Sequence, residues 1–145
     1  MISKFYVVLG RFFSLFGYHK LFVVSVMMDL LQGDDVLDDV LFVSLEEVCE
    51  SEPFSGFKVR FVHTRFMTLA YWQVGAGSVL PVHRHPHEQV MNVVKGKFEL
   101  TIENATRRLE SGVVAVIPPD AEHYGRAITD CFIIDVFYPI REDLV

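Results

Sequence analysis

The feature that most constrains the fold is a change of pattern at Lys58. From there to the C-terminus, short runs rich in valine, isoleucine, phenylalanine, threonine and tyrosine are separated by Gly, Pro, Asn and Asp. Such runs are typical of β-strands joined by tight turns. They predict strands over residues 58–64, 66–74, 79–85, 89–95, 97–102, 106–110, 113–117, 122–127 and 131–138. Many short strands, with no useful helix pattern after residue 52, predict an all-β sandwich or barrel.

Composition narrows the class of protein. The chain has 145 residues, 51% of them hydrophobic, which is enough for one domain with a sizeable core. Its 13 basic and 19 acidic residues give a formal net charge of −6. Because nucleic-acid binders present a basic face to phosphates, we expect no nucleic-acid partner. Cys49 and Cys131 lie far apart without a CxxC motif, so we expect two buried thiols of a cytoplasmic protein.

Residues 1–40 differ from the rest of the chain. Residues 1–28 carry three basic and no acidic side chains, and acidic residues follow from Asp29 onward. The longest uncharged run, Leu21–Met28, has eight residues, against the ~20 that a membrane-spanning helix needs. No small-residue cleavage site follows it, so we interpret 1–40 as an extension and expect no membrane partner. The alternatives are a signal peptide and a true start at Met27 or Met28.

The expected domain therefore covers residues 41–145. Near its start, Ser44 is followed three residues later by Glu47, which is a capping-box pattern. This pattern predicts a short helical turn over residues 44–50, ended by Pro53 and Gly56. The extension and this turn form the short helical or irregular segment expected before the β-domain.

A cluster of histidines carries the clearest chemical signal. His83 and His85 are two residues apart on a predicted strand, so their side chains point to one face. Gln89 begins the next strand, and His123 lies 34 residues further on. Imidazoles and an amide oxygen can together bind one divalent transition metal, such as Zn, Ni, Fe, Mn or Cu. The alternative is an incidental His-x-His pair on a surface or core strand. His87 has the same parity, but Pro86 turns the chain, so we expect His87 at the rim.

The spacing of these residues resembles the two motifs of the cupin superfamily. Residues 77–96 follow the first motif, with Gln89 in the usual position of glutamate, and residues 112–123 follow the second. The resemblance implies a single-domain cupin, a double-stranded β-helix or jelly-roll barrel. It also implies a bound divalent metal whose ligands are His83, His85, Gln89 and His123. Because Gln89 is neutral, such a site favours Lewis-acid chemistry over stabilising a high-valent metal.

From about residue 41 onward the chain resembles the small bacterial cupins of the KdgF type, which act in pectin degradation. The matching pieces include His85-Pro-His-Glu-Gln89, Ile117-Pro-Pro119 and the ending Asp135-Val-Phe137-Tyr-Pro139-Ile-Arg141-Glu-Asp143. The resemblance implies a metal-dependent enzyme that promotes ring opening and ketonisation of 4,5-unsaturated uronate monosaccharides from pectin or alginate. It also implies functional roles for Asp135, Phe137 and Arg141.

Those roles are physically reasonable. Asp135 and Phe137 are two apart on the last strand and share a face, so both can look toward a metal. Arg141 can reach back over the mouth of the barrel and bind a substrate carboxylate. Asp135 can move protons, and Phe137 can pack on the sugar. The alternatives are a structural Asp135–Arg141 ion pair and a purely structural Phe137.

Two other functions are compatible with the same residues. One is a cupin dioxygenase that uses Fe, Ni or Cu on a small aromatic or enediol substrate. The other is a cupin that binds a sugar or metabolite without catalysis. The fold alone does not separate them, because cupins host many chemistries. We also expect a homodimer, since cupins often pair exposed sheet edges that would otherwise invite aggregation.

Overall fold

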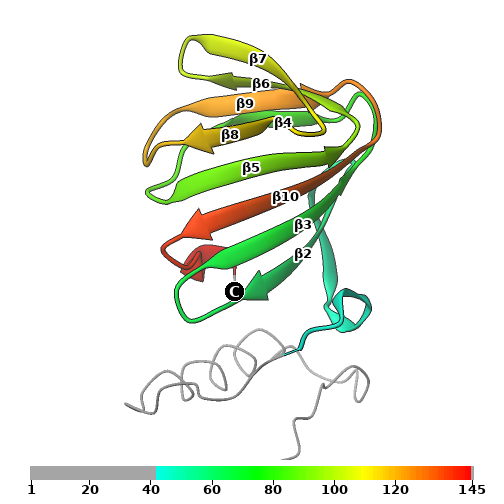
Figure 1. Ribbon diagram of the computed structural model, residues 1–145, viewed down its shortest axis with the longest axis vertical. Helices are drawn as coiled ribbons and strands as arrows, with labels where there is room; N and C mark the ends of the chain where they lie inside the picture. The colour runs from blue at the N-terminus through cyan, green and yellow to red at the C-terminus, as the bar shows by residue number, and fades with distance from the viewer. Residues whose placement is uncertain (1–41, 145) are drawn as a thin grey trace, which may run out of the picture. The chain divides into compact units, whose positions relative to one another are not determined.

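A computed structural model of the protein describes residues 42–144. Figure 1 shows strands in two layers, with almost no helix. The elements are η1 (Leu45–Glu47), β1 (Glu50–Phe54), β2 (Phe57–His63), β3 (Thr68–Val74), β4 (Val79–His83), β5 (Glu88–Lys95), β6 (Lys97–Ile102), β7 (Ala105–Glu110), β8 (Val114–Ile117), β9 (His123–Ala127), β10 (Cys131–Tyr138) and η2 (Glu142–Leu144). Within the described range, no helix is long and apolar enough to cross a membrane.

The strands form two antiparallel sheets. One has the order β1-β2-β3-β10-β5-β8, and the other has the order β4-β9-β6-β7. β10 lies between β3 and β5 in the larger sheet (Figure 1), and its residues alternate between buried and half-buried as a strand with one core face must. This is the predicted all-β jelly roll.

The core lies between the inner faces of the two sheets. Its fully buried large side chains include Val59, Val93, Phe98, Leu100, Ile117 and Ile133. Phe57 packs edge-to-face on Phe98, with ring centroids 6.5 Å apart. Burying side chains of this size stabilises the fold by roughly 1.5–3 kcal/mol each, before the entropy cost of ordering them.

All nine predicted strands are present, with ends displaced by at most two residues. The predicted helical turn over 44–50 is wrong beyond Glu47, because an additional strand, β1, begins at Glu50. β1 is an edge strand with all five residues exposed, so it shows no apolar alternation. An edge strand also tolerates Pro53, which has no N–H to donate. Gly56, at φ +78°, then makes the turn into β2.

The two cysteines differ in burial, and the predicted domain boundary lies outside the described residues. Cys131 is buried, but Cys49 is exposed just before the edge strand, so the expectation of two buried thiols is wrong for Cys49. Both are free thiols in the described part of the chain. The boundary after residue 40 and the extension before it lie outside the described residues and stay predictions.

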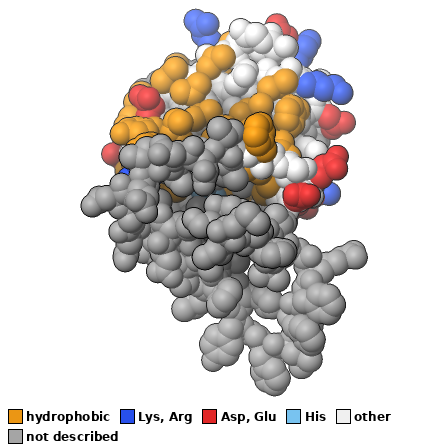
Figure 2. All heavy atoms as spheres, turned by 60° about the horizontal axis from the view of Figure 1, so that its bottom comes forward, with side chains coloured by type: hydrophobic (Ala, Val, Ile, Leu, Met, Phe, Trp, Pro, Cys, Tyr) orange, Lys and Arg blue, Asp and Glu red, His pale blue; other side chains and the backbone are white. Residues whose placement is uncertain are grey.

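Large hydrophobic side chains also reach the surface, as Figure 2 shows for one face. Val114 and Val116 on the edge strand β8 are 53% and 59% exposed. Exposed apolar residues on a sheet edge are suited to association with another chain.

Two turn glycines give a matched test of the packing. Gly96 and Gly112 both have a positive φ, of 92° and 88°. A Cβ on Gly96 would overlap the carbonyl oxygen of Asp130, whereas a Cβ on Gly112 would meet nothing within 4 Å. We expect Gly112→Ala to cost about 1–2 kcal/mol of backbone strain. Gly96→Ala should lose roughly 1–3 kcal/mol more through overpacking. Equal losses in denaturant unfolding would contradict this packing.

Candidate metal centre

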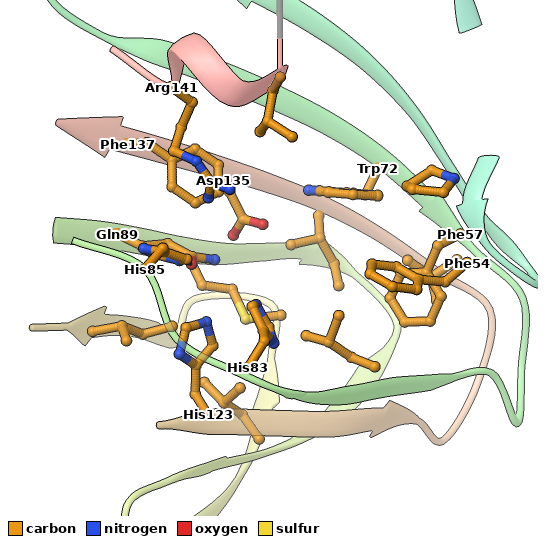
Figure 3. Close-up of a pocket in the computed structure, with 18 of the residues that line it drawn as sticks. Phe54, Phe57, Trp72, His83, His85, Gln89, His123, Asp135, Phe137 and Arg141 are labelled. Atoms are coloured by element: carbon orange, nitrogen blue, oxygen red, sulfur yellow. The ribbon is translucent and has the colours of Figure 1, made fainter. Parts of the chain in front are cut away.

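Three histidines converge at one end of the space between the sheets. His83 ends β4 and is paired in register with His123, the first residue of β9. His85 lies just beyond the end of β4, so the predicted strand 79–85 was two residues too long. Their potential ligand atoms all lie within 4.8 Å of one another. The His123 ring centroid is 4.1 Å from that of His83 and 5.0 Å from that of His85 (Figure 3). These three histidines could hold a metal ion.

A backbone carbonyl fixes the tautomer of each ring. The Nδ1–H groups of His83, His85 and His123 donate to the carbonyls of Pro81, His87 and Ala121 at 2.9, 3.0 and 2.8 Å, respectively. Because a carbonyl only accepts, Nδ1 carries the proton of each neutral ring and Nε2 keeps its lone pair. Metal-binding histidines commonly donate their second ring nitrogen in this way.

The Nε2 atoms of His85 and His123 face no hydrogen-bond donor among the described residues. Nε2 of His123 is buried without a hydrogen-bond partner among residues 42–144. Nε2 of His85 lies 3.1 Å from Oε1 of Gln89, which is also an acceptor. A cation between these two acceptors would relieve their repulsion. The residues therefore fit a divalent metal, with three imidazole nitrogens and one amide oxygen as a neutral donor set.

Burial favours the neutral form of His85 and His123. Burial, helped by the nearby His83, His85 and Arg141, lowers the pKa of His123 to about 4, against the hydrogen bond to Ala121, which raises it. Burial also lowers the pKa of His85, with Arg141 contributing. A neutral imidazole can bind a metal without first losing a proton, so both rings are ready ligands at neutral pH.

Asp135 and Phe137 lie on one face of β10, as the sequence predicts, and the structure shows that this face is the interior one. Burial raises the pKa of Asp135 to about 7, and the facing side chains of Gln89 and Trp72 offset part of that rise. Its Oδ1 has no hydrogen-bond partner in the described structure. Phe137 pairs with Gln89 across the sheet, and its ring lies 5.5 Å from the ring of His85.

Arg141 lies on the segment after β10 and lines the same cavity. Its guanidinium binds both carboxylate oxygens of Asp143, at 2.8 and 2.7 Å. The alternative of a structural Asp135–Arg141 ion pair is therefore wrong, because the partner is Asp143. The guanidinium also lies 5.0 Å from the ring centre of Phe137.

The cavity between these groups has a volume of about 300 Å³. Its far wall is aromatic and is formed by residues that no sequence motif marks, including Phe54, Phe57 and Trp72 (Figure 3). Strand parity places Trp72 inward, but only the pairing of β3 with β10 brings it beside the site. His87 is not one of the three converging histidines, and its place at the rim stays a prediction.

Comparisons with known proteins agree with the fold. A family model for the cupin domain matches residues 70–137. An RmlC-like cupin from Shewanella frigidimarina is 27% identical, with a TM-score of 0.68 over 74% of this chain and 97% of that chain. KdgF from Halomonas sp. is 29% identical, with a TM-score of 0.69 over 74% and 100%. The cupin domain of Schizosaccharomyces pombe Cnp3, at 17% identity and a TM-score of 0.60, is similar in fold alone.

The histidine cluster predicts which substitutions remove bound metal. His123→Ala should lower metal affinity by more than the roughly 10–100-fold that loss of an outer-shell partner costs. His87→Ala is the matched control and should keep the metal, because the hydrogen bond that orients His85 comes from the backbone carbonyl of His87, which the substitution leaves in place. Elemental analysis after dialysis against a competing chelator measures both. Metal loss in His87→Ala, or retention in His123→Ala, would contradict the assignment.

The buried Asp135 predicts how stability depends on pH in chelator-treated protein. Its pKa is about 7 when folded and near 3.8 when unfolded, so the folded state binds the proton more tightly. The contribution of protonated Asp135 to the free energy of unfolding is therefore complete below about pH 4, and it is lost as the pH rises through 7. Asp135→Asn should remove this loss, which amounts to up to about 4 kcal/mol. Denaturant unfolding from pH 5 to 8 tests this, and parallel profiles for both proteins would contradict it.

Proposed function

Because residues 70–137 match a family model for the cupin domain and the chain is similar to KdgF from Halomonas sp., we propose that it is a metal-dependent uronate-converting enzyme. It promotes ring opening and ketonisation of 4,5-unsaturated uronate monosaccharides derived from pectin or alginate. The observation that carries the proposal is one cavity lined by three histidines, a buried carboxyl group and a guanidinium group.

In this mechanism His83, His85 and His123 would hold the metal, and Gln89 would complete the donor set. When bound, the metal would supply Lewis-acid chemistry at a substrate oxygen. The histidines supply three neutral nitrogens and, with Gln89, leave the full charge of the metal uncompensated by its ligands. An anionic substrate is the natural ligand for such a centre.

Asp135 carries the proton transfers. Ring opening removes a proton from the anomeric hydroxyl and breaks the bond between the anomeric carbon and the ring oxygen. Ketonisation then adds a proton to the carbon at position 4, so the product is an isomer of the substrate. With a pKa of about 7, Asp135 exchanges protons readily in both directions near neutral pH.

Arg141 and Phe137 bind the substrate. The guanidinium binds the sugar carboxylate through charge-assisted hydrogen bonds. Phe137 lies within reach of both Arg141 and His85, so its ring packs against the sugar between the carboxylate and the metal. The aromatic wall excludes water from the far side of the cavity.

That aromatic wall also favours a second candidate function. Phe57 and Trp72 form an apolar surface, with ring centroids 6.0 Å apart, that suits a small aromatic substrate. A cupin dioxygenase acting on such a substrate would consume O₂, whereas the isomerisation does not.

The proposal includes a cytoplasmic homodimer. Free thiols support a reducing compartment, because disulfides form mainly in oxidising ones. The exposed Val114 and Val116 on the edge of the larger sheet support self-association.

Decay of the ultraviolet absorbance of a 4,5-unsaturated uronate tests the activity. We expect metal-loaded protein to accelerate decay above the spontaneous rate. Arg141→Ala should reduce kcat/KM by at least about 10–100-fold, which is the effect of losing a single charge-assisted hydrogen bond. Arg107→Ala, on the exposed face of β7, is the control and should match the parent. No acceleration by the metal-loaded parent would exclude this function, and O₂ consumption with an aromatic substrate would favour the dioxygenase.

A further inference from the structure

The guanidinium of Arg141 is already engaged on one of its edges. Nε and Nη2 donate to the two oxygens of Asp143, which follows two residues later on the η2 turn. An arginine has five N–H groups, so three remain: two on Nη1 and one on Nη2. A substrate carboxylate at Arg141 must therefore use the edge formed by Nη1 and Nη2, unless it displaces Asp143.

Three further contacts fix this arrangement. The backbone N–H of Arg141 donates to Oγ1 of the fully buried Thr68 at 2.9 Å. The guanidinium lies over Phe137, and the side chain of Arg141 is only 12% exposed. The backbone N–H of Leu144 donates to the carbonyl of Arg141 at 3.2 Å, which closes the turn that presents Asp143. Arg141 is thus held by the hydrogen bonds of its backbone, by the ring of Phe137 and by the bond from its Nε to Asp143.

We infer that Asp143 is a positioning residue, which orients Arg141 so that its Nη1 edge receives the carboxylate of an acidic sugar. The inference rests on the proposed function and deepens it, because it assigns the preference for acidic over neutral sugars to an Arg141–Asp143 unit. Asp143 acts through Arg141 and has no role in the proton transfers.

Asp143 has two opposing effects on the binding of a substrate carboxylate. Its negative charge repels an incoming carboxylate, but its side chain is 60% exposed, so solvent and salt screen that repulsion. Against this, a free arginine side chain loses much rotamer freedom when it binds a ligand. Asp143 orders the guanidinium before the substrate arrives, and pre-organisation of this kind strengthens binding. The ordering effect outweighs the screened repulsion.

The neighbouring Glu142 provides a matched control. It lies on the same η2 turn and carries the same charge, but it makes no salt bridge within the described residues. Asp143→Asn and Glu142→Gln therefore change the net charge equally, and only the first weakens the hold on Arg141. Asp143→Glu keeps the charge and can restore part of the contact.

The kinetic test measures KM and kcat for the unsaturated uronate. We expect Asp143→Asn to raise KM about tenfold with kcat changed less than about twofold, as loss of a charge-assisted hydrogen bond to Arg141 implies. Asp143→Glu should recover part of that loss, and Glu142→Gln should match the parent. An unchanged or lowered KM in Asp143→Asn would overturn the inference, since Asp143 would then be a bystander or a competitor of the substrate.

A second readout does not depend on catalysis. The Nε–H resonance of Arg141 in nitrogen-15 NMR spectra can be identified by its loss in Arg141→Lys. We expect it to be visible in the parent and Glu142→Gln, and lost to solvent exchange in Asp143→Asn. Its persistence in Asp143→Asn would overturn the inference. If the parent is inactive on uronates but galacturonate, and not galactose, shifts this resonance, the proposed function fails while the positioning role of Asp143 stands.

Discussion

Three short hydrogen bonds, from the Nδ1–H groups of His83, His85 and His123 to backbone carbonyls, determine what the rest of this site can do. They fix each tautomer and leave three Nε2 lone pairs facing one space. The fold supplies the acceptors, because each carbonyl lies two residues from its histidine. The backbone N–H of Asp120 also donates to the carbonyl of His85 at 2.8 Å, which ties the loop before His123 to the loop that carries His85.

Apart from the proposed metal, the groups around this space carry little uncompensated charge. Burial holds the pKa of Asp135 near 7, so the carboxyl group is only partly ionised at neutral pH. Arg141 is neutralised by Asp143 on the solvent side. The donor groups of the histidines and Gln89 are neutral. A divalent ion here would be the largest uncompensated charge, which is the physical reason why an acidic substrate suits the site better than a neutral sugar.

The sequence predicts most of the fold because its strands have one buried face and their turns are marked by Gly, Pro, Asn and Asp. Strand parity alone places Asp135 and Phe137 on one face of β10, and the burial pattern of the structure shows that this face is the interior one. β1 could not be predicted, since an exposed edge strand has no buried face to reveal it. The Arg141–Asp143 contact was missed for a different reason: it depends on the η2 turn, whose geometry no periodic pattern encodes.

X-ray absorption spectroscopy of protein loaded with Zn²⁺ tests the central claim most directly, because it reports the ligands themselves. The account predicts three imidazole nitrogens at about 2.0–2.1 Å, with the outer-shell scattering typical of histidine rings. One of those rings should be absent from the spectrum of His123→Ala. A first shell made of oxygen alone, or one unchanged by His123→Ala, would show that these histidines do not bind the metal.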